Sequence, residues 1–308
     1  MINDAPKRPR IVVGFDARPG GEDAAALAAL IANRKAAVLA TIIMPLPPRV
    51  VGDPPLKAAA GARTWQDVCS DLERQGLEAL ADRALPLLPG LDVEREAILD
   101  DSTARALTWL CEREEADMLV LGPTHRGKLG RLAVGATADR LLNGSPCPVA
   151  LAPRGFAGLD RGPIRTIGVG YDGSEASSLA VRAGAELALD HDAELRLIGV
   201  VDPDSHAEAR VLGEALDALS GQGLRDRRAE QVREAVEREL EELPAALRST
   251  VEIVHGDPVA TLRDRTRSLD LLVVGSRGYG ALRRVLLGSV SIGLIRVAQC
   301  PVIVTRGA

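Results

Sequence analysis

The chain repeats a pattern of residues at a separation of about half its length, and this repeat restricts the folds open to it. Positions rich in glycine and leucine recur 153 residues later without a gap. In the first half they are Gly122, Gly127, Leu129, Arg131, Gly135, Leu141, Cys147, Pro148 and Val149, and in the second half Gly275, Gly280, Leu282, Arg284, Gly288, Leu294, Cys300, Pro301 and Val302. The starts of the halves also match, because IVVGFD ends at Asp16 and IGVGYD ends at Asp172. A repeat of this length indicates a duplicated domain and excludes a solenoid of short units.

The domain boundary follows from the repeat and from composition. A chain of 308 residues is long enough for about two domains. The segment 153–163, PRGFAGLDRGP, is rich in glycine, proline and charge, as exposed interdomain segments are. We therefore place domain one at residues 1–153 and domain two at residues 163–308.

Each half alternates short apolar runs with longer helical segments such as 175–189 and 229–243. The runs are nearly continuous in Val, Ile and Leu, which is typical of strands covered on both faces. They span 10–16, 37–44, 93–99, 117–122 and 147–153 in the first half, and 164–172, 194–201, 250–256, 270–276 and 300–306 in the second. Alternation of strand and helix predicts a parallel sheet with right-handed crossovers. We expect an α/β protein of two tandem, doubly wound, Rossmann-like domains, each with five parallel strands.

A glycine-rich segment after the run 270–276 is a candidate phosphate site. Gly275, Gly278, Gly288 and Ser289 follow the spacing G-x2-G-x9-G-S. Glycines let backbone N–H groups approach an anion closely, and a helix beginning near Ser289 adds unsatisfied donors and a positive dipole end. Tight strand–helix turns, with Ser289 only as an N-cap, explain the same residues equally well. The motif alone leaves both interpretations open.

Two aspartates end the first run of each half. Asp16 and Asp172 are expected in the crevice beyond the carboxyl ends of a parallel sheet, where ligands bind. A carboxylate there can accept a hydrogen bond from an adenine amino group or a ribose hydroxyl. A role as a turn or N-cap residue is equally compatible with the sequence, most clearly in the segment 172–175, DGSE.

Two familiar motifs do not fit their usual context. The G-x-G-x-x-G of residues 168–173 lies inside a strand pattern and not after it, as a dinucleotide fingerprint requires. The segment 122–128 begins like a phosphate-binding loop of an NTPase, but Leu129 stands where a Ser or Thr would bind Mg²⁺. We interpret Cys147 and Cys300, each before a last strand, as buried small hydrophobes and not as reactive thiols.

Composition excludes several classes of partner. The formal net charge is −5 and aromatic residues make up 2% of the chain, so we expect neither nucleic acid nor an anionic membrane as a partner. No apolar run approaches the length of a membrane span, and the N-terminus lacks the apolar core of a secretory signal. We therefore expect a cytoplasmic protein.

The order strand–Asp, then VVG with a glycine loop, then CPV and a last strand, occurring twice, resembles the universal stress protein family. The second half, with GSRGYGALRRVLLGSVS followed by CPVIVTR, is similar to the ATP-binding form of that family. The resemblance implies a fold like that of the adenine nucleotide alpha hydrolases and a bound ATP, with or without Mg²⁺. It places Asp172 and Val200 at the adenosine end and glycine and serine residues at the phosphates. The implied phosphate residues are Gly275, Gly278, Gly288, Ser289, Val290 and Ser291.

The first half departs from this pattern at the paired positions. His125 replaces Gly278, Ala136 replaces Ser289 and Ala138 replaces Ser291. Asp16, Gly122 and Gly135 remain, so we expect a degenerate nucleotide site there and one tightly bound ATP per chain, in the second half.

The resemblance implies a regulatory nucleotide-binding protein of the stress response, and we expect no enzymatic activity. A slow ATP hydrolase or nucleotidyl-transfer enzyme in the same pocket is the alternative; no acidic residue from Gly275 to Gln299 is available to hold a metal. The final strands 149–152 and 302–305 are expected to pair edge to edge and make the halves an internal pseudo-dimer. The sequence leaves a homodimer of whole chains open.

Overall fold

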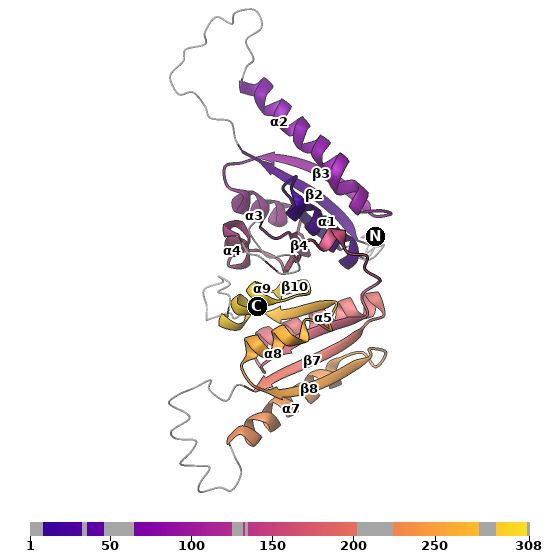
Figure 1. The fold of residues 1–308 in the computed structure, drawn as a ribbon, viewed down its shortest axis with the longest axis vertical. Helices are drawn as coiled ribbons and strands as arrows, with labels where there is room; N and C mark the ends of the chain where they lie inside the picture. Colours follow the sequence, from indigo (N-terminus) through magenta and orange to yellow (C-terminus); the bar gives the residue numbers. More distant parts are fainter. Residues whose placement is uncertain are drawn as a thin grey trace, which may run out of the picture.

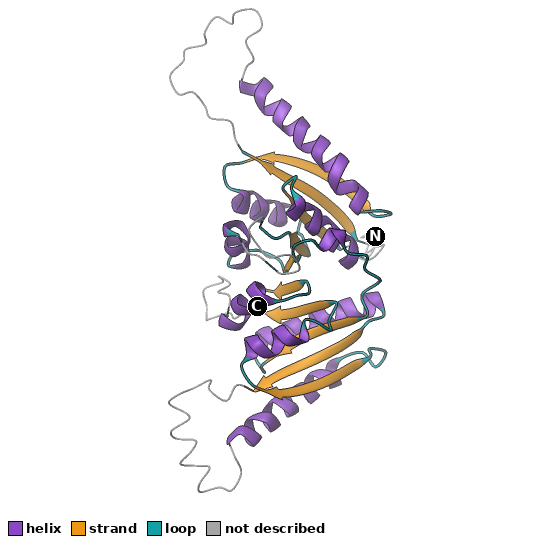
Figure 2. Ribbon diagram, in the orientation of Figure 1, coloured by secondary structure: helices purple, strands orange, loops and turns teal. Residues whose placement is uncertain are grey.

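The fold is a single ten-stranded sheet with helices on both faces (Figures 1 and 2). It is taken from a computed structural model that describes residues 9–32, 36–45, 65–124, 132, 135–201, 224–276 and 288–306. Gly278, His125 and the residues around them lie outside this part of the chain. The predicted α/β class with a mostly parallel sheet is confirmed.

The first half contributes five strands and four α-helices in the described residues. In chain order they are β1 (Arg10–Phe15), α1 (Pro19–Ile31), β2 (Ala37–Met44), α2 (Trp65–Ala79), β3 (Asp92–Leu99), α3 (Thr103–Arg113), β4 (Met118–Leu121), α4 (Ala136–Leu142) and β5 (Val149–Leu151). A π-helical turn, η1 (Leu80–Ala84), and a 3-10 turn, η2 (Leu85–Leu87), follow α2.

The second half repeats this order after a 3-10 turn, η3 (Phe156–Gly158). Its elements are β6 (Thr166–Tyr171), α5 (Glu175–His191), β7 (Glu194–Val201), α7 (Leu224–Glu242), β8 (Ser249–His255), α8 (Pro258–Arg265), β9 (Leu271–Gly275), α9 (Ser289–Val297) and β10 (Val302–Thr305).

Strand order places a ligand crevice in each half. The sheet runs β3-β2-β1-β4-β5-β10-β9-β6-β7-β8, so each half has the doubly wound order with its first and fourth strands as neighbours. All pairs within a half are parallel. The order reverses direction between β1 and β4 and between β6 and β9, and such switch points are where open α/β sheets bind ligands.

The two halves join through their last strands. β5 and β10 pair antiparallel, with Val149 opposite Val304, Ala150 opposite Ile303 and Leu151 opposite Val302. This is the edge-to-edge pairing expected from the sequence, and it satisfies backbone groups that two separate sheet edges would expose. One continuous sheet therefore runs through both halves.

The cores on both faces of the sheet also cross this junction. On one face, α1 and α5 pack against β-strand residues of both halves, including Ala150 and Ile303. On the other face, α3, α4, α8 and α9 pack against residues that include Val149 and Val302. The inner strands of the sheet are mostly apolar because both of their faces are covered, whereas the edge strands β3 and β8 are partly exposed.

A buried carboxylate on α1 holds the start of the interdomain segment. Asp23 is 2% exposed, and its two oxygens accept hydrogen bonds from the backbone N–H of Gly155 (2.8 Å) and of Ala157 (2.9 Å). Burial raises the pKa of this carboxyl, while the backbone donors lower it. Phe156 between them is buried, and the Arg161 guanidinium carbon lies 4.4 Å from the centre of its ring. The segment predicted to be exposed is thus anchored at its start and exposed at residues 158–163.

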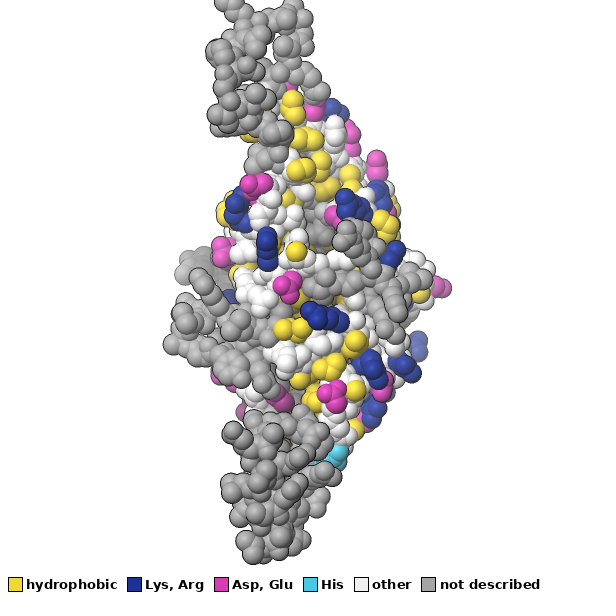
Figure 3. Space-filling model, turned by 60° about the vertical axis from the view of Figure 1, so that its left-hand side comes forward, with side chains coloured by type: hydrophobic (Ala, Val, Ile, Leu, Met, Phe, Trp, Pro, Cys, Tyr) yellow, Lys and Arg dark blue, Asp and Glu magenta, His cyan; other side chains and the backbone are white. Residues whose placement is uncertain are grey.

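The surface charge and the hydropathy of the helices concern the two partners not expected from the sequence, nucleic acid and a membrane. On the face drawn in Figure 3, acidic and basic side chains of the described residues are interspersed and do not form a patch of a single sign. None of the helices in the described ranges combines the length and hydropathy needed to cross a bilayer.

Replacing Asp23 tests whether it anchors the interdomain segment. Asp23→Ala leaves two backbone donors near α1 without their acceptor, which should lower the free energy of unfolding by about 2 kcal/mol. It should also speed tryptic cleavage at Arg154 and Arg161. Urea unfolding and timed digestion measure the two effects. Glu186→Ala, at an exposed carboxylate of α5, is the control and should shift stability by less than about 0.5 kcal/mol; equal behaviour of the two variants would contradict the anchoring role.

Candidate functional site

A cavity of about 790 Å³ opens in the second half beside the carboxyl ends of β6, β7 and β9. This volume is in the range of small-molecule sites, and the position is the switch point of the half-sheet. Every sequence-predicted residue of the second half that the structure describes lines it: Asp172, Val200, Gly275, Gly288, Ser289, Val290 and Ser291. Gly278 lies outside the described residues. The structure therefore brings together side chains from β6, β7, β9 and α9 that are far apart in the sequence.

Asp172 begins the turn that leads into α5. Its Oδ1 accepts hydrogen bonds from the backbone N–H of Ser174 at 3.0 Å and from the Ser174 hydroxyl at 2.5 Å. Gly173 between them has a φ of +80°, which a glycine adopts without strain. Ser174 in turn is the N-cap of α5, accepting from the Ser177 N–H at 3.2 Å. The turn interpretation of Asp172 is confirmed, and its carboxylate still lines the cavity.

Gly275 allows the first turn of α5 to pack against the end of β9. A Cβ at this position would lie 2.4 Å from the Ala176 carbonyl oxygen. The paired Gly122 is in the same situation, since its Cβ would lie 1.7 Å from the carbonyl oxygen of Gly20 in α1. Close helix–strand packing therefore explains this glycine in both halves, and in the second half that packing sets one wall of the cavity.

The N-terminus of α9 forms another wall of the cavity. Gly288 is the N-cap and Ser289 is the first helical residue, so of the two interpretations left open by the sequence, the one in which Ser289 is the N-cap is wrong. The Ser289 side chain is exposed, and no hydrogen-bond partner of its hydroxyl occurs within the described residues. The helical hydrogen bonds begin with the Ile292 N–H, which donates to the Gly288 carbonyl. The N–H groups of Ser289, Val290 and Ser291 precede that bond and belong to the unsatisfied first turn.

Ser291 has a structural hydrogen bond. Its side chain is 4% exposed, and the hydroxyl donates to the carbonyl oxygen of Gly275 at 2.9 Å. This bond ties α9 to the end of β9. It fixes where the first turn of α9 lies relative to the cavity.

The remaining walls combine apolar and polar side chains that sequence reasoning did not single out. Ile198, Val259, Leu262 and Val274 provide apolar surface, and Gln231 of α7 and Asp257 contribute polar groups. Asp257 is the N-cap of α8, and its Oδ1 accepts from the Ala260 N–H at 2.6 Å. The D-P pair at 257–258 was a signal for a helix start, but its position beside Asp172 depends on tertiary packing.

The first half keeps the same backbone frame. The Asp16 carboxylate accepts from the Arg18 N–H at 3.1 Å and from the Gly21 N–H at 3.0 Å, and Ala17 has a φ of +52° where the second half has Gly173. Gly135 is the N-cap of α4, as Gly288 is of α9. The structure thus places Asp16, Gly122 and Gly135 as turn, packing and capping residues.

The first half differs from the second in the side chains that this backbone frame carries. Ala136 and Ala138 begin α4 in place of the two serines of α9. Strand register places Thr41 beside Gly14, as Ile198 lies beside Gly170. The Thr41 hydroxyl is buried, and no hydrogen-bond partner for it occurs in the part of the chain that the structure describes.

The glycines of the G-x-G-x-x-G motif serve strand packing. Gly168 and Gly170 lie within β6. A Cβ on Gly168 would lie 2.3 Å from the Leu269 side chain, and one on Gly170 would lie 3.1 Å from Leu262. The interpretation that this motif is not a dinucleotide fingerprint is consistent with this placement. Within the described ranges, no group of three or more potential His, Cys, Asp or Glu metal ligands occurs.

Comparison with known proteins defines the family. The model of the universal stress protein family matches residues 7–153 and again residues 163–306. The chain is therefore a member of the universal stress protein family with two tandem copies of its domain.

Relatives share this tandem arrangement. A universal stress protein of Mycobacterium tuberculosis is 30% identical over 320 residues, which cover 96% of this chain and 99% of the relative. Among solved structures, a universal stress protein from Archaeoglobus fulgidus is 17% identical with a TM-score of 0.62, covering 98% of this chain and 100% of that one. A functionally unknown protein from Pseudomonas aeruginosa is 15% identical with a TM-score of 0.58 and covers 97% and 92% of the two chains. The structural likenesses show the fold.

Gly275→Ala tests the packing of the cavity wall. The new methyl group collides with the Ala176 backbone, so α5 must shift, and the free energy of unfolding should fall by about 1–3 kcal/mol. Chemical denaturation measures the change. Gly158→Ala is the matched control, because nothing lies within 4 Å of a Cβ at that glycine. A Gly275→Ala protein as stable as the control would show that the close approach at β9 is not required.

Proposed function

We propose that the second half binds ATP and that the nucleotide acts as a regulatory ligand. The observation that carries the proposal is the composition of one cavity, which has a helix N-terminus with an exposed serine at one wall and apolar strand ends with a carboxylate at another. A nucleoside triphosphate needs both kinds of surface. The cavity volume of about 790 Å³ is sufficient for a ligand of this class.

The phosphates would bind at the start of α9. The N–H groups of Ser289, Val290 and Ser291 have no acceptor one turn earlier in the helix, and the positive end of the helix dipole favours an anion. The Ser289 hydroxyl adds a fourth donor. Gly288 as N-cap presents no side chain that competes with the ligand for these donors, and the Ser291–Gly275 hydrogen bond holds the turn in place.

The adenosine would bind at the strand ends. Ile198 and Val200 of β7 and Leu262 of α8 offer apolar contact for a base. Asp172 offers the carboxylate that accepts a hydrogen bond from a ribose hydroxyl or an adenine amino group. One Asp172 oxygen also holds the α5 turn, so the residue would couple ligand binding to the start of that helix.

A regulatory role fits the side chains better than catalysis. Phosphoryl transfer needs a metal-holding carboxylate and a positioned base or water near the phosphates. The chain has no acidic residue from Gly275 to Gln299, the segment that contains the proposed phosphate site. We therefore propose a binding protein that responds to ATP and not an enzyme.

A slow ATP hydrolase or nucleotidyl-transfer enzyme is the second candidate. Asp172 and Asp257 both line the cavity, and two carboxylates there can hold Mg²⁺ through water. Phosphate or pyrophosphate release by the purified protein, abolished in a double Asp172→Asn, Asp257→Asn variant, would favour this candidate.

We also propose that the protein is located in the cytoplasm, because ATP is supplied there.

Ser289→Ala tests the phosphate end of the site. Loss of a hydrogen bond to a charged phosphate should weaken ATP binding by roughly 10–150-fold, equivalent to about 1.5–3 kcal/mol. Isothermal titration calorimetry measures the affinity. Ser268→Ala is the control, since that hydroxyl donates to the Arg265 carbonyl at 3.1 Å outside the cavity. Unchanged affinity in Ser289→Ala would remove Ser289 from the proposed site.

The difference between the halves predicts one tight site per chain. Ala136 lacks the hydroxyl that Ser289 offers to a phosphate, and Ala138 lacks the hydroxyl with which Ser291 holds the first turn of α9, so an ATP at α4 should bind roughly 10–150-fold more weakly. Equilibrium dialysis at ATP concentrations above the dissociation constant of the tight site should reach a first plateau at one ATP per chain. A single plateau at two equivalent ATP per chain would contradict the asymmetry.

A further inference from the structure

A cavity of about 280 Å³ lies where the interdomain segment enters the second half. It is lined by Leu30 of α1, by residues 161–165 and by Asp270. Arg165 directly precedes β6 and Asp270 directly precedes β9, so this cavity lies at the amino ends of the two strands. The nucleotide cavity lies at the carboxyl ends of the same strands, and the two cavities are therefore separate.

Two arginines of this cavity belong to a segment that buried contacts hold in place. The guanidinium carbon of Arg161 lies 4.4 Å from the centre of the Phe156 ring, and Phe156 is buried. The backbone N–H of Arg165 donates to the Asp270 Oδ2 at 2.9 Å. Ile164, the residue before Arg165, is 1% exposed. The segment that carries both arginines is thus ordered without a ligand, which lowers the entropy lost when one binds.

The protein does not neutralise the two guanidinium groups. Both arginines are exposed, and neither forms an ion pair or a side-chain hydrogen bond within the residues that the structure describes. The carboxylate of Asp270 is bound instead to the backbone, because its Oδ2 also accepts from the Thr166 N–H at 3.0 Å. The described lining of this cavity therefore presents two cations and one carboxylate.

The corresponding place in the first half is neutralised. Asp117, paired with Asp270, accepts from the Arg10 N–H at 2.7 Å in the same way. The Arg10 guanidinium, however, forms ion pairs with Glu94 at 2.8 Å and with Glu114 at 2.5 Å. The position paired with Glu114 is Arg267, so the second half has a further positive charge where the first half has a negative one. The excess of positive charge belongs to the second half and not to the repeated frame.

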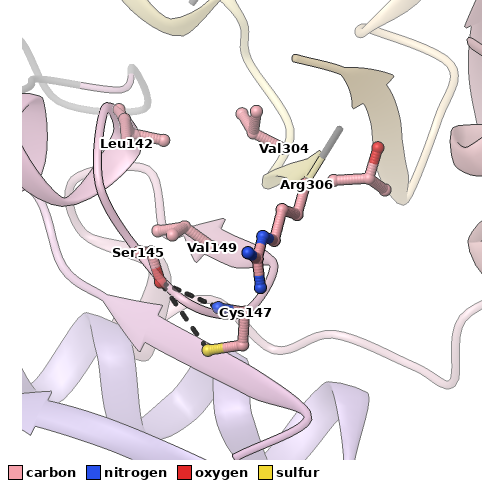
Figure 4. Close-up of a pocket in the computed structure, with 7 residues that line it drawn as sticks. Leu142, Ser145, Cys147, Val149, Val304 and Arg306 are labelled. Carbon is pink, nitrogen blue, oxygen red and sulfur yellow. Dashed lines mark hydrogen bonds between the residues drawn. The ribbon is translucent and has the colours of Figure 1, made fainter. Parts of the chain in front are cut away.

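A smaller cavity at the junction of the halves lacks these properties (Figure 4). It lies among Leu142, Ser145, Cys147 and Arg306 and has a volume of about 10 Å³, room for a molecule about the size of water. The Arg306 side chain donates to the Pro146 carbonyl at 2.8 Å, and the Ser145 oxygen accepts from the Cys147 N–H at 3.3 Å. These polar groups are engaged with the protein, whereas the two arginines at Asp270 have space and no acceptor.

We propose that the cavity at Asp270 binds a small phosphate monoester. Guanidinium groups donate two parallel hydrogen bonds to phosphate oxygens, and Arg161 and Arg165 supply two such groups. The Oδ1 of Asp270 is an acceptor for a hydroxyl of the ligand. Leu30 and Pro163 offer apolar contact to a short carbon chain. The volume of about 280 Å³ is just below the usual range of drug-sized sites, which suits a ligand of a few carbon atoms.

Titration of the full-length protein with glycerol 3-phosphate tests the proposal. Isothermal titration calorimetry in a phosphate-free buffer should show saturable binding of one molecule per chain. Inorganic phosphate should bind more weakly, because it lacks the carbon chain and the hydroxyls, and glycerol should not bind. Absence of saturable binding of glycerol 3-phosphate, or binding of glycerol with equal affinity, would overturn the proposal.

Variants locate the site. Arg161→Ala and Arg165→Ala should each weaken glycerol 3-phosphate binding by at least about tenfold, because each removes charged donors to the phosphate. Arg161→Lys keeps the charge but loses the planar fork, so it should weaken binding as well. All three changes are at exposed side chains, and circular dichroism checks that the fold is kept. Their ATP affinity should not change, which separates this site from the nucleotide cavity.

Arg182→Ala is the matched control. It removes one positive charge from an exposed side chain of α5, whose ion pair with Glu242 at 3.3 Å lies outside this cavity. Its affinity for glycerol 3-phosphate should stay nearly that of the unaltered chain. An equal loss in Arg182→Ala would show attraction by overall charge and not a site. Full binding in both Arg161→Ala and Arg165→Ala, as expected if the ester occupied the nucleotide cavity, would also overturn the proposal.

Discussion

Backbone pairing between β5 and β10 is the interaction on which the rest of the structure depends. Two short apolar strands, Val149–Leu151 and Val302–Thr305, would each leave a sheet edge with unpaired N–H and C=O groups. Their antiparallel pairing closes both edges at once and lets the hydrophobic core continue across the junction on each face of the sheet. Two further contacts flank the paired strands. After β5, the backbone of Gly155 donates to Asp23, and after β10, Arg306 donates to the Pro146 carbonyl, which precedes β5.

Both halves are built on one backbone frame and differ in a few side chains at the corresponding positions. An aspartate that orders the turn after the first strand, a glycine that admits the first helix and a glycine N-cap recur in each half. None of these three features by itself binds a nucleotide. In the second half, the hydroxyl of Ser289 lies at an exposed helix start beside a cavity with apolar and polar walls, whereas Ala136 begins the corresponding helix of the first half.

The inner strands were predictable because burial on both faces makes them nearly continuous apolar runs, which is not true of the partly exposed edge strands β3 and β8. The runs 37–44 and 194–201 coincide with β2 and β7, and the repeat carried the assignment from one half to the other. The candidate site was predictable as a set of residues at strand ends, but not as a geometry. The sequence could not show that Gly288 and not Ser289 caps α9, or that Gln231 and Asp257 complete the cavity, because each depends on contacts between distant segments. Asp23 was missed for the same reason: its partners lie more than a hundred residues away.

The central claim is that ATP occupies the second half with its phosphates at the start of α9. A crystal structure of the full chain grown with ATP tests this most directly. The account predicts density for the base between Val200 and Leu262, a ribose or amino contact to Asp172, and a phosphate within hydrogen-bond distance of the Ser289 hydroxyl and of the first N–H groups of α9. Density for ATP beside α4 with the cavity of the second half empty, or phosphates directed away from α9, would contradict it.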